Sequence, residues 1–205
     1  LSATIFVDKK EKISGKTSKE LLQAIEQSVT RALAPNTIRL LYTDSAATTD
    51  NSIFSALQLP APGALLRNVN AAQSMAGVIN VGGSQSTFFI LSVDSYSNTF
   101  AGMLSWELTM PRDLNSLFPS YANQQTNPVG YASLSTSTIP TVSNVIVPAF
   151  RDEVISNHDT RIYRDAEGRD IIVYGYWNQT TLIIARDIAA FTEILGRLAT
   201  SHTQQ

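Results

Sequence analysis

The chain of 205 residues contains no cysteine, and this absence excludes several kinds of chemistry. Disulfide bonds, thiolate nucleophiles, zinc ribbons and iron–sulfur clusters all depend on cysteine side chains. Histidine is almost as scarce, since the chain has only His158 and His202. His202 falls in a C-terminal tail that we expect to be frayed from about residue 199. The sequence therefore predicts no metal site and no cofactor, and it leaves one imidazole for catalysis.

Charged residues are also few. They make up 16% of the chain, below the roughly 25% that is typical of soluble domains. The 15 basic and 17 acidic residues give a net charge of −2, which provides no basic surface for nucleic acid or an anionic membrane. We therefore predict no nucleic-acid partner. Together with the missing cysteines and the many hydroxyl and amide side chains, the low charge favours an extracytoplasmic location in a bacterium.

Long apolar runs are missing as well. No segment reaches the roughly 18 apolar residues that a membrane-spanning helix needs, and no signal peptide is recognisable. The chain begins with Leu1 rather than Met, and we expect that an N-terminal anchor has been removed. On this hypothesis the protein is tethered to the bacterial cytoplasmic membrane, and it contacts the membrane only through that missing anchor.

The clearest structural pattern lies in the C-terminal quarter. Alternating, β-branched and aromatic residues predict strands at residues 160–164, 170–177 and 180–185, with turn residues between them. An amphipathic helix is expected to open at Asp187 and to end near Leu198. These elements predict a β-β-β-α block whose helix packs on the strands.

The N-terminal part predicts a β-α-β unit. Thr17 and Glu20 have the spacing of a capping box at the start of a helix that Pro35 would end. Apolar runs at residues 4–8 and 37–42 predict the two flanking strands.

The middle of the chain predicts a hairpin and several helices. Glycines at positions 82 and 83 favour a hairpin turn over a phosphate-binding loop, because neither a lysine nor a helix follows them. Asp94 would cap a helix that breaks near Pro111. The hairpin strands are expected at residues 76–81 and 86–93, short helices near 52–57 and 63–71, and a further strand at 142–149.

Together these elements predict a single α+β (mixed α/β) domain over residues 1–205. We expect an antiparallel or mixed sheet that ends in the β-β-β-α block, with helices packed on one face. Residues 119–144 contain no charged side chain, so an uncharged loop or insertion is expected there.

His158 and Asp159 form the first pair that could carry chemistry. An aspartate beside a histidine could orient the imidazole as a base for a distant serine. However, the sequence has no G-x-S-x-G elbow to supply that nucleophile. We therefore favour a polar turn that precedes a strand.

Glu107 is the second candidate for catalysis. It lies seven residues after Phe100, on nearly the same face of the helix that follows Asp94. A carboxylate beside an apolar stripe must be paired or hydrogen-bonded. One hypothesis is an acid in a groove. The other, which we favour, is a structural carboxylate that pairs with Arg112 or a nearby backbone amide.

Aromatic side chains are the candidates for binding. Tyr174 and Tyr176 share one face of a predicted strand and Trp177 lies on the other, so at least one of these faces belongs to the core. An exposed aromatic surface could bind glycans or a protein partner. The candidate binding residues elsewhere in the chain are Trp106, Tyr121 and Tyr131.

Two segments carry a resemblance to known proteins. The first is the run F-A-G-M-L-S-W-E at residues 100–107 with Asp113, Leu114 and Phe118, and the second contains Phe150, Arg151, Asp152, Asn157, Asp159 and Arg161. Both resemble recurring blocks of uncharacterised membrane-anchored extracytoplasmic domain proteins of small-genome candidate-phylum bacteria. This resemblance implies a single N-terminal transmembrane helix followed by an extracytoplasmic α/β domain. It implies no activity and no functional residues.

These observations favour a non-enzymatic envelope or surface module that binds a protein partner or associates with itself. One alternative is a carboxylate-dependent hydrolase that acts on cell-wall or glycan material through Glu107 or Asp159. A second alternative is a small-ligand sensor domain.

Overall fold

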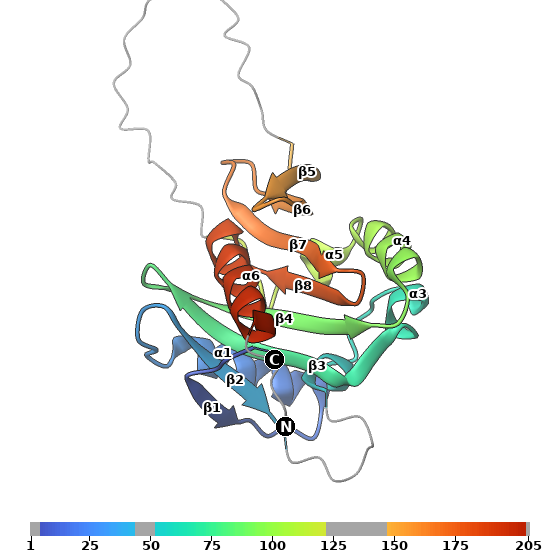
Figure 1. The fold of residues 1–205 in the computed structure, drawn as a ribbon. Helices are drawn as coiled ribbons and strands as arrows, with labels where there is room; N and C mark the ends of the chain where they lie inside the picture. The colour runs from blue at the N-terminus through green and yellow to red at the C-terminus, as the bar shows by residue number, and fades with distance from the viewer. Residues whose placement is uncertain (1–4, 44–51, 122–146, 204–205) are drawn as a thin grey trace, which may run out of the picture.

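The computed structural model describes residues 5–43, 52–121 and 147–203, which form one eight-stranded sheet (Figure 1). The strand order is β1-β2-β3-β4-β8-β7-β6-β5. β1 and β2 are parallel, and every other neighbouring pair is antiparallel. The strands are β1 (Lys9–Lys12), β2 (Thr37–Tyr42), β3 (Val69–Val81), β4 (Ser84–Val93), β5 (Ala149–Ile155), β6 (His158–Arg164), β7 (Asp170–Asn178) and β8 (Thr181–Ala185).

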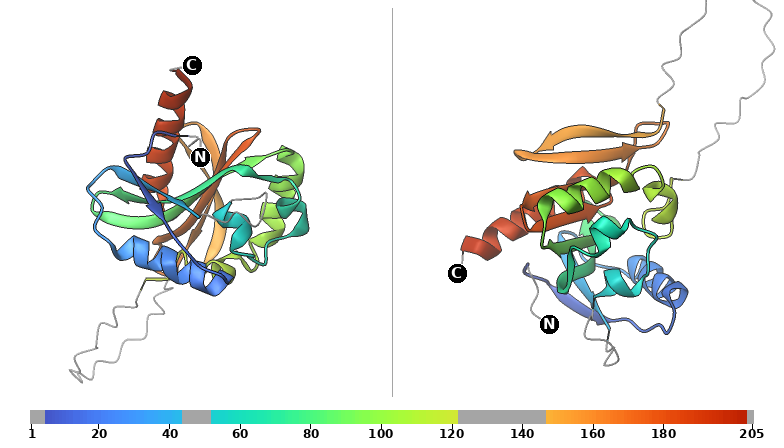
Figure 2. Two further views of the ribbon diagram at one scale, coloured as in Figure 1. Left: turned by 90° about the horizontal axis from the view of Figure 1, so that it is seen from below. Right: turned by 90° about the vertical axis from the view of Figure 1, so that its right-hand side faces the viewer.

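Helices cover both faces of this sheet (Figure 2). α6 (Ile188–Thr203) packs on one face, and the remaining helices lie on the opposite face. The predicted α+β class and the C-terminal β-β-β-α block are therefore confirmed. The helices on the second face are α1 (Ser18–Thr30), α2 (Ile53–Ala56), α3 (Gly63–Leu66), α4 (Tyr96–Trp106) and α5 (Met110–Asp113).

Each face of the sheet contributes to its own apolar core. Along β4, Phe88 and Ile90 pack on the α6 side, whereas Phe89 and Leu91 pack on the side of the other helices. Burial on both faces explains why β4 is a continuous apolar run rather than an alternating one. The expectation that helices pack on one face is corrected for the same reason, because both faces are apolar and both need cover.

The N-terminal β-α-β unit is present, but its first strand lies later in the chain than predicted. The strand is the charged segment Lys9–Lys12, which runs parallel to β2 at the outer edge of the sheet. Of the apolar segment predicted at 4–8, Ile5 is buried in the α6-side core, and the Asp8 N–H donates to the carbonyl of Ile38 (3.0 Å). Charge on an outer strand discourages pairing with other chains. The prediction followed apolar content and therefore selected the wrong segment.

The start of α1 follows the predicted capping box. The Oγ1 of Thr17 accepts a hydrogen bond from the backbone N–H of Glu20 (3.2 Å). The Glu20 carboxylate in turn accepts from the N–H of Lys16 (2.6 Å), one residue before the position that a standard capping box would use. The helix ends at Thr30, well before Pro35.

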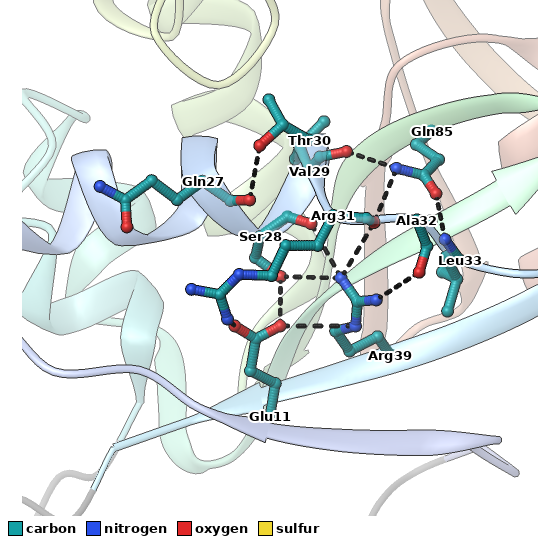
Figure 3. Close-up of polar contacts among 10 residues, drawn as sticks. All are labelled: Glu11, Gln27, Ser28, Val29, Thr30, Arg31, Ala32, Leu33, Arg39 and Gln85. Atoms are coloured by element: carbon teal, nitrogen blue, oxygen red, sulfur yellow. Dashed lines mark hydrogen bonds and ion pairs between the residues drawn. The ribbon is translucent and has the colours of Figure 1, made fainter.

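A buried arginine on the sheet bonds to the C-terminal end of α1 (Figure 3). Arg39 of β2 is 6% exposed, and its guanidinium donates to the carbonyls of Ser28 (2.8 Å) and Ala32 (3.1 Å). The carboxylate of Glu11 on β1 lies 3.4 Å from Arg39 Nε and neutralises its charge. The last carbonyls of a helix have no partner within the helix. Arg39 therefore satisfies them and ties α1 to β2 and β1.

Gln85 of β4 completes this C-terminal cap. Its amide donates to the carbonyls of Val29 and Arg31, and its Oε1 accepts from the N–H of Leu33 (2.6 Å) (Figure 3). The α1 end is therefore fixed by side chains from the sheet rather than by a basic residue in its own last turn.

The segment after β4 forms two helices, as predicted, although its cap differs. The Oγ of Ser95, not Asp94, accepts from the N–H of Asn98 at the start of α4. α4 ends at Trp106, and Pro111 lies in the first turn of α5, where a proline is tolerated. Gly102 allows α4 to approach α3, because a Cβ at this position would lie 2.8 Å from the backbone N of Leu65.

Other boundaries also differ from the sequence predictions. The hairpin between β3 and β4 is confirmed, and Gly82 and Gly83 adopt positive φ values of 60° and 89°. α6 continues to Thr203 instead of fraying from about residue 199. β5 begins at Ala149, and most of the strand predicted at 142–149 lies outside the described residues.

Candidate functional site

A cleft of about 510 Å3 lies between α4 and the hairpin of β5 and β6. This hairpin forms the outer edge of the sheet, beyond β7, and α4 lies beneath it in the right-hand view of Figure 2. Ser156 and Asn157 make its two-residue turn, with φ values of 50° and 63°. Both residues in the left-handed region are typical of a type I′ turn, which suits the twist of adjacent strands.

Aromatic rings form one wall of the cleft. Tyr96 and Phe100 lie one turn apart on α4, and their rings stack with centroids 5.7 Å apart. Tyr176 of β7 contacts Tyr96 edge-on at 4.7 Å, and its hydroxyl donates to Thr99 Oγ1 (2.9 Å). These contacts hold the rings in place, and Tyr96 remains 42% exposed. The wall is therefore a preformed apolar surface that a ligand can reach.

An ion-pair network lies against the cleft, and we call it the floor; Asp152, Arg161 and Tyr174 line the cavity, whereas Glu107 does not. Arg161 of β6 donates Nε and Nη2 to the two oxygens of Glu107, each at 2.6 Å, and Nη1 to Asp152 Oδ1 at 2.7 Å. The hydroxyl of Tyr174 also donates to Glu107 Oε1 (2.6 Å). A bidentate arginine–carboxylate pair is geometrically specific. Because two carboxylates share one guanidinium, the network keeps one net negative charge.

The protonation of this floor follows from its contacts. The hydrogen bond to Glu107 raises the pKa of Arg161 above its already high value. Burial, reinforced by the Glu107 carboxylate, raises the pKa of Tyr174, and burial raises the pKa of Tyr176 to about 12. Both phenols therefore keep their protons at neutral pH. They act in the cleft as hydrogen-bond donors and apolar surface, not as general bases.

His158 and Asp159 lie on the rim of this cleft. The structure therefore brings the predicted pair to the same cavity as Arg161, which in turn bonds to Glu107. The threonine that lines the cleft, Thr160, donates its hydroxyl to the carbonyl of Glu153 (2.8 Å). That hydroxyl is engaged in the hairpin and is not placed as a nucleophile for His158.

Glu107 and Trp106 have structural partners that the sequence did not predict. Glu107 pairs with Arg161 and not with Arg112, which lies 3.2 Å from Asp113 instead. Trp106 is 1% exposed, and its Nε1 donates to Asp113 (3.0 Å). Because its ring is buried in the core, Trp106 is not available at the surface, and its prediction as a binding residue is corrected.

Of the remaining aromatic candidates, Tyr121 does not line the cleft. Tyr121 is 40% exposed, and its ring contacts the guanidinium groups of Arg169 and Arg186 at 4.6 Å and 4.5 Å from its centroid. Tyr131 lies outside the described residues.

Sequence reasoning did not select Tyr96, Phe100 or Arg161 for the site. The four-residue spacing of Tyr96 and Phe100 on a predicted helix was an available signal for an aromatic pair. The contact between Glu107 and Arg161 spans 54 positions. It depends on the strand order, so no local pattern could have revealed it.

Many exposed apolar side chains lie on the segments that flank the cleft, and two of them, Tyr96 and Val154, line it. Among the described residues, eight large apolar side chains are exposed, and five of them lie on α4 and the residues after it or on β5 and the residues before it. Single exposed apolar residues are ordinary, whereas clusters mark interaction surfaces. The five are Tyr96, Leu104, Leu108, Val147 and Val154.

Two further findings limit the chemistry of the described residues. They contain no group of three or more histidine or acidic side chains that could hold a metal ion. None of the helices formed by these residues is long and apolar enough to cross a membrane. No protein-family model, no curated protein and no solved structure matches the chain.

Proposed function

We propose that this protein is a non-enzymatic binding module whose cleft takes a cationic, extended segment of a partner protein. The observation that carries the proposal is the pairing of a preformed aromatic wall with surplus carboxylates on the opposite side of one cavity. Aromatic faces and carboxylates together attract lysine and arginine side chains.

The charge of the cleft favours a cation. Glu107 and Asp152 share Arg161, so one negative charge remains on the floor. Asp159 adds a second negative charge on the exposed rim. A partner that brings a lysine or arginine neutralises this surplus, and charge complementarity of this kind contributes specificity and faster association.

The shape of the site favours an extended segment. β5 is the last strand of the sheet, and its outer backbone edge has no neighbouring strand among the described residues. Peptides commonly add a strand to such an edge, with alternate side chains entering adjacent pockets. Val154 of β5 is 70% exposed beside the cleft, so an added segment would find an apolar contact next to the carboxylates.

The same geometry gives less support to a hydrolase. Arg161 occupies both oxygens of Glu107, and Tyr174 adds a third hydrogen bond. A general acid or base must reach the substrate with a free oxygen. A binding role uses the Glu107 network as it stands, because that network fixes the position of Asp152 and Arg161.

We retain the extracytoplasmic, membrane-tethered location as part of this proposal. It rests on the low charge and the absence of cysteine, and on the resemblance of residues 100–107 and 150–161 to membrane-anchored domains. Protease accessibility in intact cells that express the full reading frame tests the location. Protection of the domain until the cells are lysed would contradict it.

Selection from a library of linear peptides, followed by titration of the selected peptides, tests the binding function. We expect enriched peptides to carry lysine or arginine beside apolar residues. Asp159→Asn removes a rim charge without touching the floor, and it should weaken their binding about threefold to tenfold. Tyr96→Ala should weaken binding by a similar factor, because the exposed ring supplies contact area.

Glu26→Gln is the matched control, since Glu26 is an exposed carboxylate on α1. It should leave the affinity unchanged. The proposal fails if selection yields no specific peptide, or if the Asp159 and Tyr96 variants bind as well as the Glu26 variant. Concentration-dependent dimerisation that Asp159→Asn abolishes would identify a second copy of the chain as the partner and would replace the peptide proposal.

A further inference from the structure

Arg186, immediately after β8, is buried without a hydrogen-bond partner for part of its charged group. The residue is 7% exposed, and its Nη1 is fully buried and unpartnered. Its nearest aromatic contact is the ring of Tyr121, 4.5 Å from the guanidinium carbon to the ring centroid. A buried cation that is not hydrogen-bonded and neutralised destabilises the folded state. A group that accepts hydrogen bonds from Arg186 and neutralises its charge would therefore stabilise the folded protein.

A second unpartnered atom lies at a facing position. The Oγ1 of Thr87 in β4 is buried without a hydrogen bond, and the residue is 1% exposed. β4 and β8 pair Phe89 with Ile184, and continuing this register by two pairs places Thr87 opposite Arg186. Within the described part of the chain, these two residues hold the buried side-chain polar atoms that lack a partner.

Carboxylates near Arg186 along the chain are already engaged. Asp165 binds Arg169 (2.7 Å), and Asp170 binds Arg164 (2.8 Å). Neither neutralises Arg186. The guanidinium therefore contacts an aromatic ring, and no ion pair to it is formed among the described residues.

Neither Asp187 nor the uncharged segment 119–144 provides a carboxylate that neutralises Arg186. Asp187 caps α6, because its Oδ1 accepts from the N–H of Ala190 (2.8 Å). Residues 119–144, which follow Phe118 in the sequence, include no acidic side chain. None of these groups neutralises Arg186, and an anion from outside the chain would do so.

We propose that Arg186 and Thr87 bind a small oxyanion, either a phosphate or a carboxylate group. The planar guanidinium donates two parallel hydrogen bonds to such a group, and the threonine hydroxyl donates a third. Tyr121, which contacts both Arg186 and Arg169, lies next to the site. None of these residues lines the cleft between α4 and the β5–β6 hairpin, so the site is independent of the peptide-binding proposal.

Isothermal titration calorimetry with inorganic phosphate and, separately, with acetate tests this site. The wild type should bind at least one of the two saturably. Phosphate binding without acetate binding identifies a phosphate group, and the reverse identifies a carboxylate group. Arg186→Met should weaken binding at least about tenfold, because hydrogen bonds to charged groups contribute more than neutral ones.

Thr87→Val provides a second test that conserves shape. It removes the hydroxyl without changing the packing volume, and it should weaken binding about threefold to tenfold. This variant decides the question if Arg186→Met does not fold. Arg67→Met is the matched control, because Arg67 is an exposed arginine at the C-terminal end of α3 and is absent from the proposed site, and it should bind as the wild type does.

Two results would overturn the proposal. One is the absence of saturable binding of either anion by the wild type. The other is equal affinity in the wild type, Arg186→Met and Thr87→Val, which would mean that phosphate acts only through its general exclusion from protein surfaces.

Discussion

Two buried arginines lie on the same face of the sheet, and their surroundings differ sharply. Arg39 on β2 pairs with Val78 on β3, and Val78 pairs with Thr87 on β4. Because the β4–β8 register places Thr87 opposite Arg186, these four positions form one row across the sheet. Their exposed fractions are nearly equal, 6% and 7%. Arg39 bonds to the end of α1 and to Glu11, whereas Arg186 has an unpartnered Nη1 beside Tyr121.

This difference separates structure from function. A buried arginine whose hydrogen bonds are all made within the chain fixes the packing of a helix on the sheet. A buried arginine that lacks such partners destabilises the free protein, and folds retain such groups at sites that bind a ligand. Burial alone therefore does not reveal the role of a charged side chain. The partners of that side chain do.

The largest expected effect is at Arg39. Arg39→Met removes the donor to the carbonyls of Ser28 and Ala32 and one of the two arginines that contact Glu11. Because two buried carbonyls lose a charged donor, the free energy of unfolding should fall by about 2–4 kcal/mol. Urea denaturation measures the change. A loss of stability no greater than that of the exposed control, Arg67→Met, would contradict a structural role for Arg39.

A substitution at Glu107 tests whether Arg161, like Arg39, stabilises the fold through partners within the chain. Glu107→Gln keeps the shape of the side chain but removes the charge that Arg161 contacts at two oxygens. We expect the free energy of unfolding to fall by about 1–3 kcal/mol, since a charged hydrogen bond becomes a neutral one. Unchanged stability would instead place Arg161 with Arg186, as a group held for a ligand.

Asp113, whose hydrogen-bond donors also lie within the chain, should make a smaller contribution to the free energy of unfolding, and this contribution should depend on pH. Burial alone would raise the pKa of Asp113, but hydrogen bonds from Thr109 and Trp106 outweigh it and lower the pKa. A lowered pKa in the folded state stabilises the protein above the ordinary pKa of about 4, and this contribution is lost as the pH falls through the folded-state value.

Asp113→Asn should therefore lower the free energy of unfolding by about 1–2 kcal/mol at neutral pH. The difference from the wild type should shrink on acidification below about pH 4. Chemical denaturation at a series of pH values checks this. A difference that stays constant over the whole series would show that the Asp113 carboxylate is not stabilised by its donors.

Local signals in the sequence predicted the elements with distinct boundaries. The capping residue Thr17, the turn glycines Gly82 and Gly83, and the apolar strands of the C-terminal block were all identified correctly. Apolar content misplaced the first strand, because the outer strand β1 is charged. Such signals act over a few residues, so they define where elements begin and end.

The polar groups that define the sites could not be predicted in the same way. Glu107 meets Arg161 across 54 positions, and Gln85 meets Val29 across 56. The facing positions of Thr87 and Arg186 follow from the order of β4 and β8. These contacts depend on which strands are neighbours in the sheet, and the local alternation of side chains does not encode that order.

The most direct test of the contrast between Arg39 and Arg186 is the unfolding free energy of Arg186→Met relative to the wild type, measured by urea denaturation without and with saturating phosphate. Without phosphate the variant should be at least as stable as the wild type, by up to about 4 kcal/mol, because a buried unpaired charge is gone. With phosphate the order should reverse, because the anion stabilises the wild type alone. A variant that is less stable than the wild type by the same amount in both buffers would contradict the account, since Arg186 would then be a structural residue like Arg39.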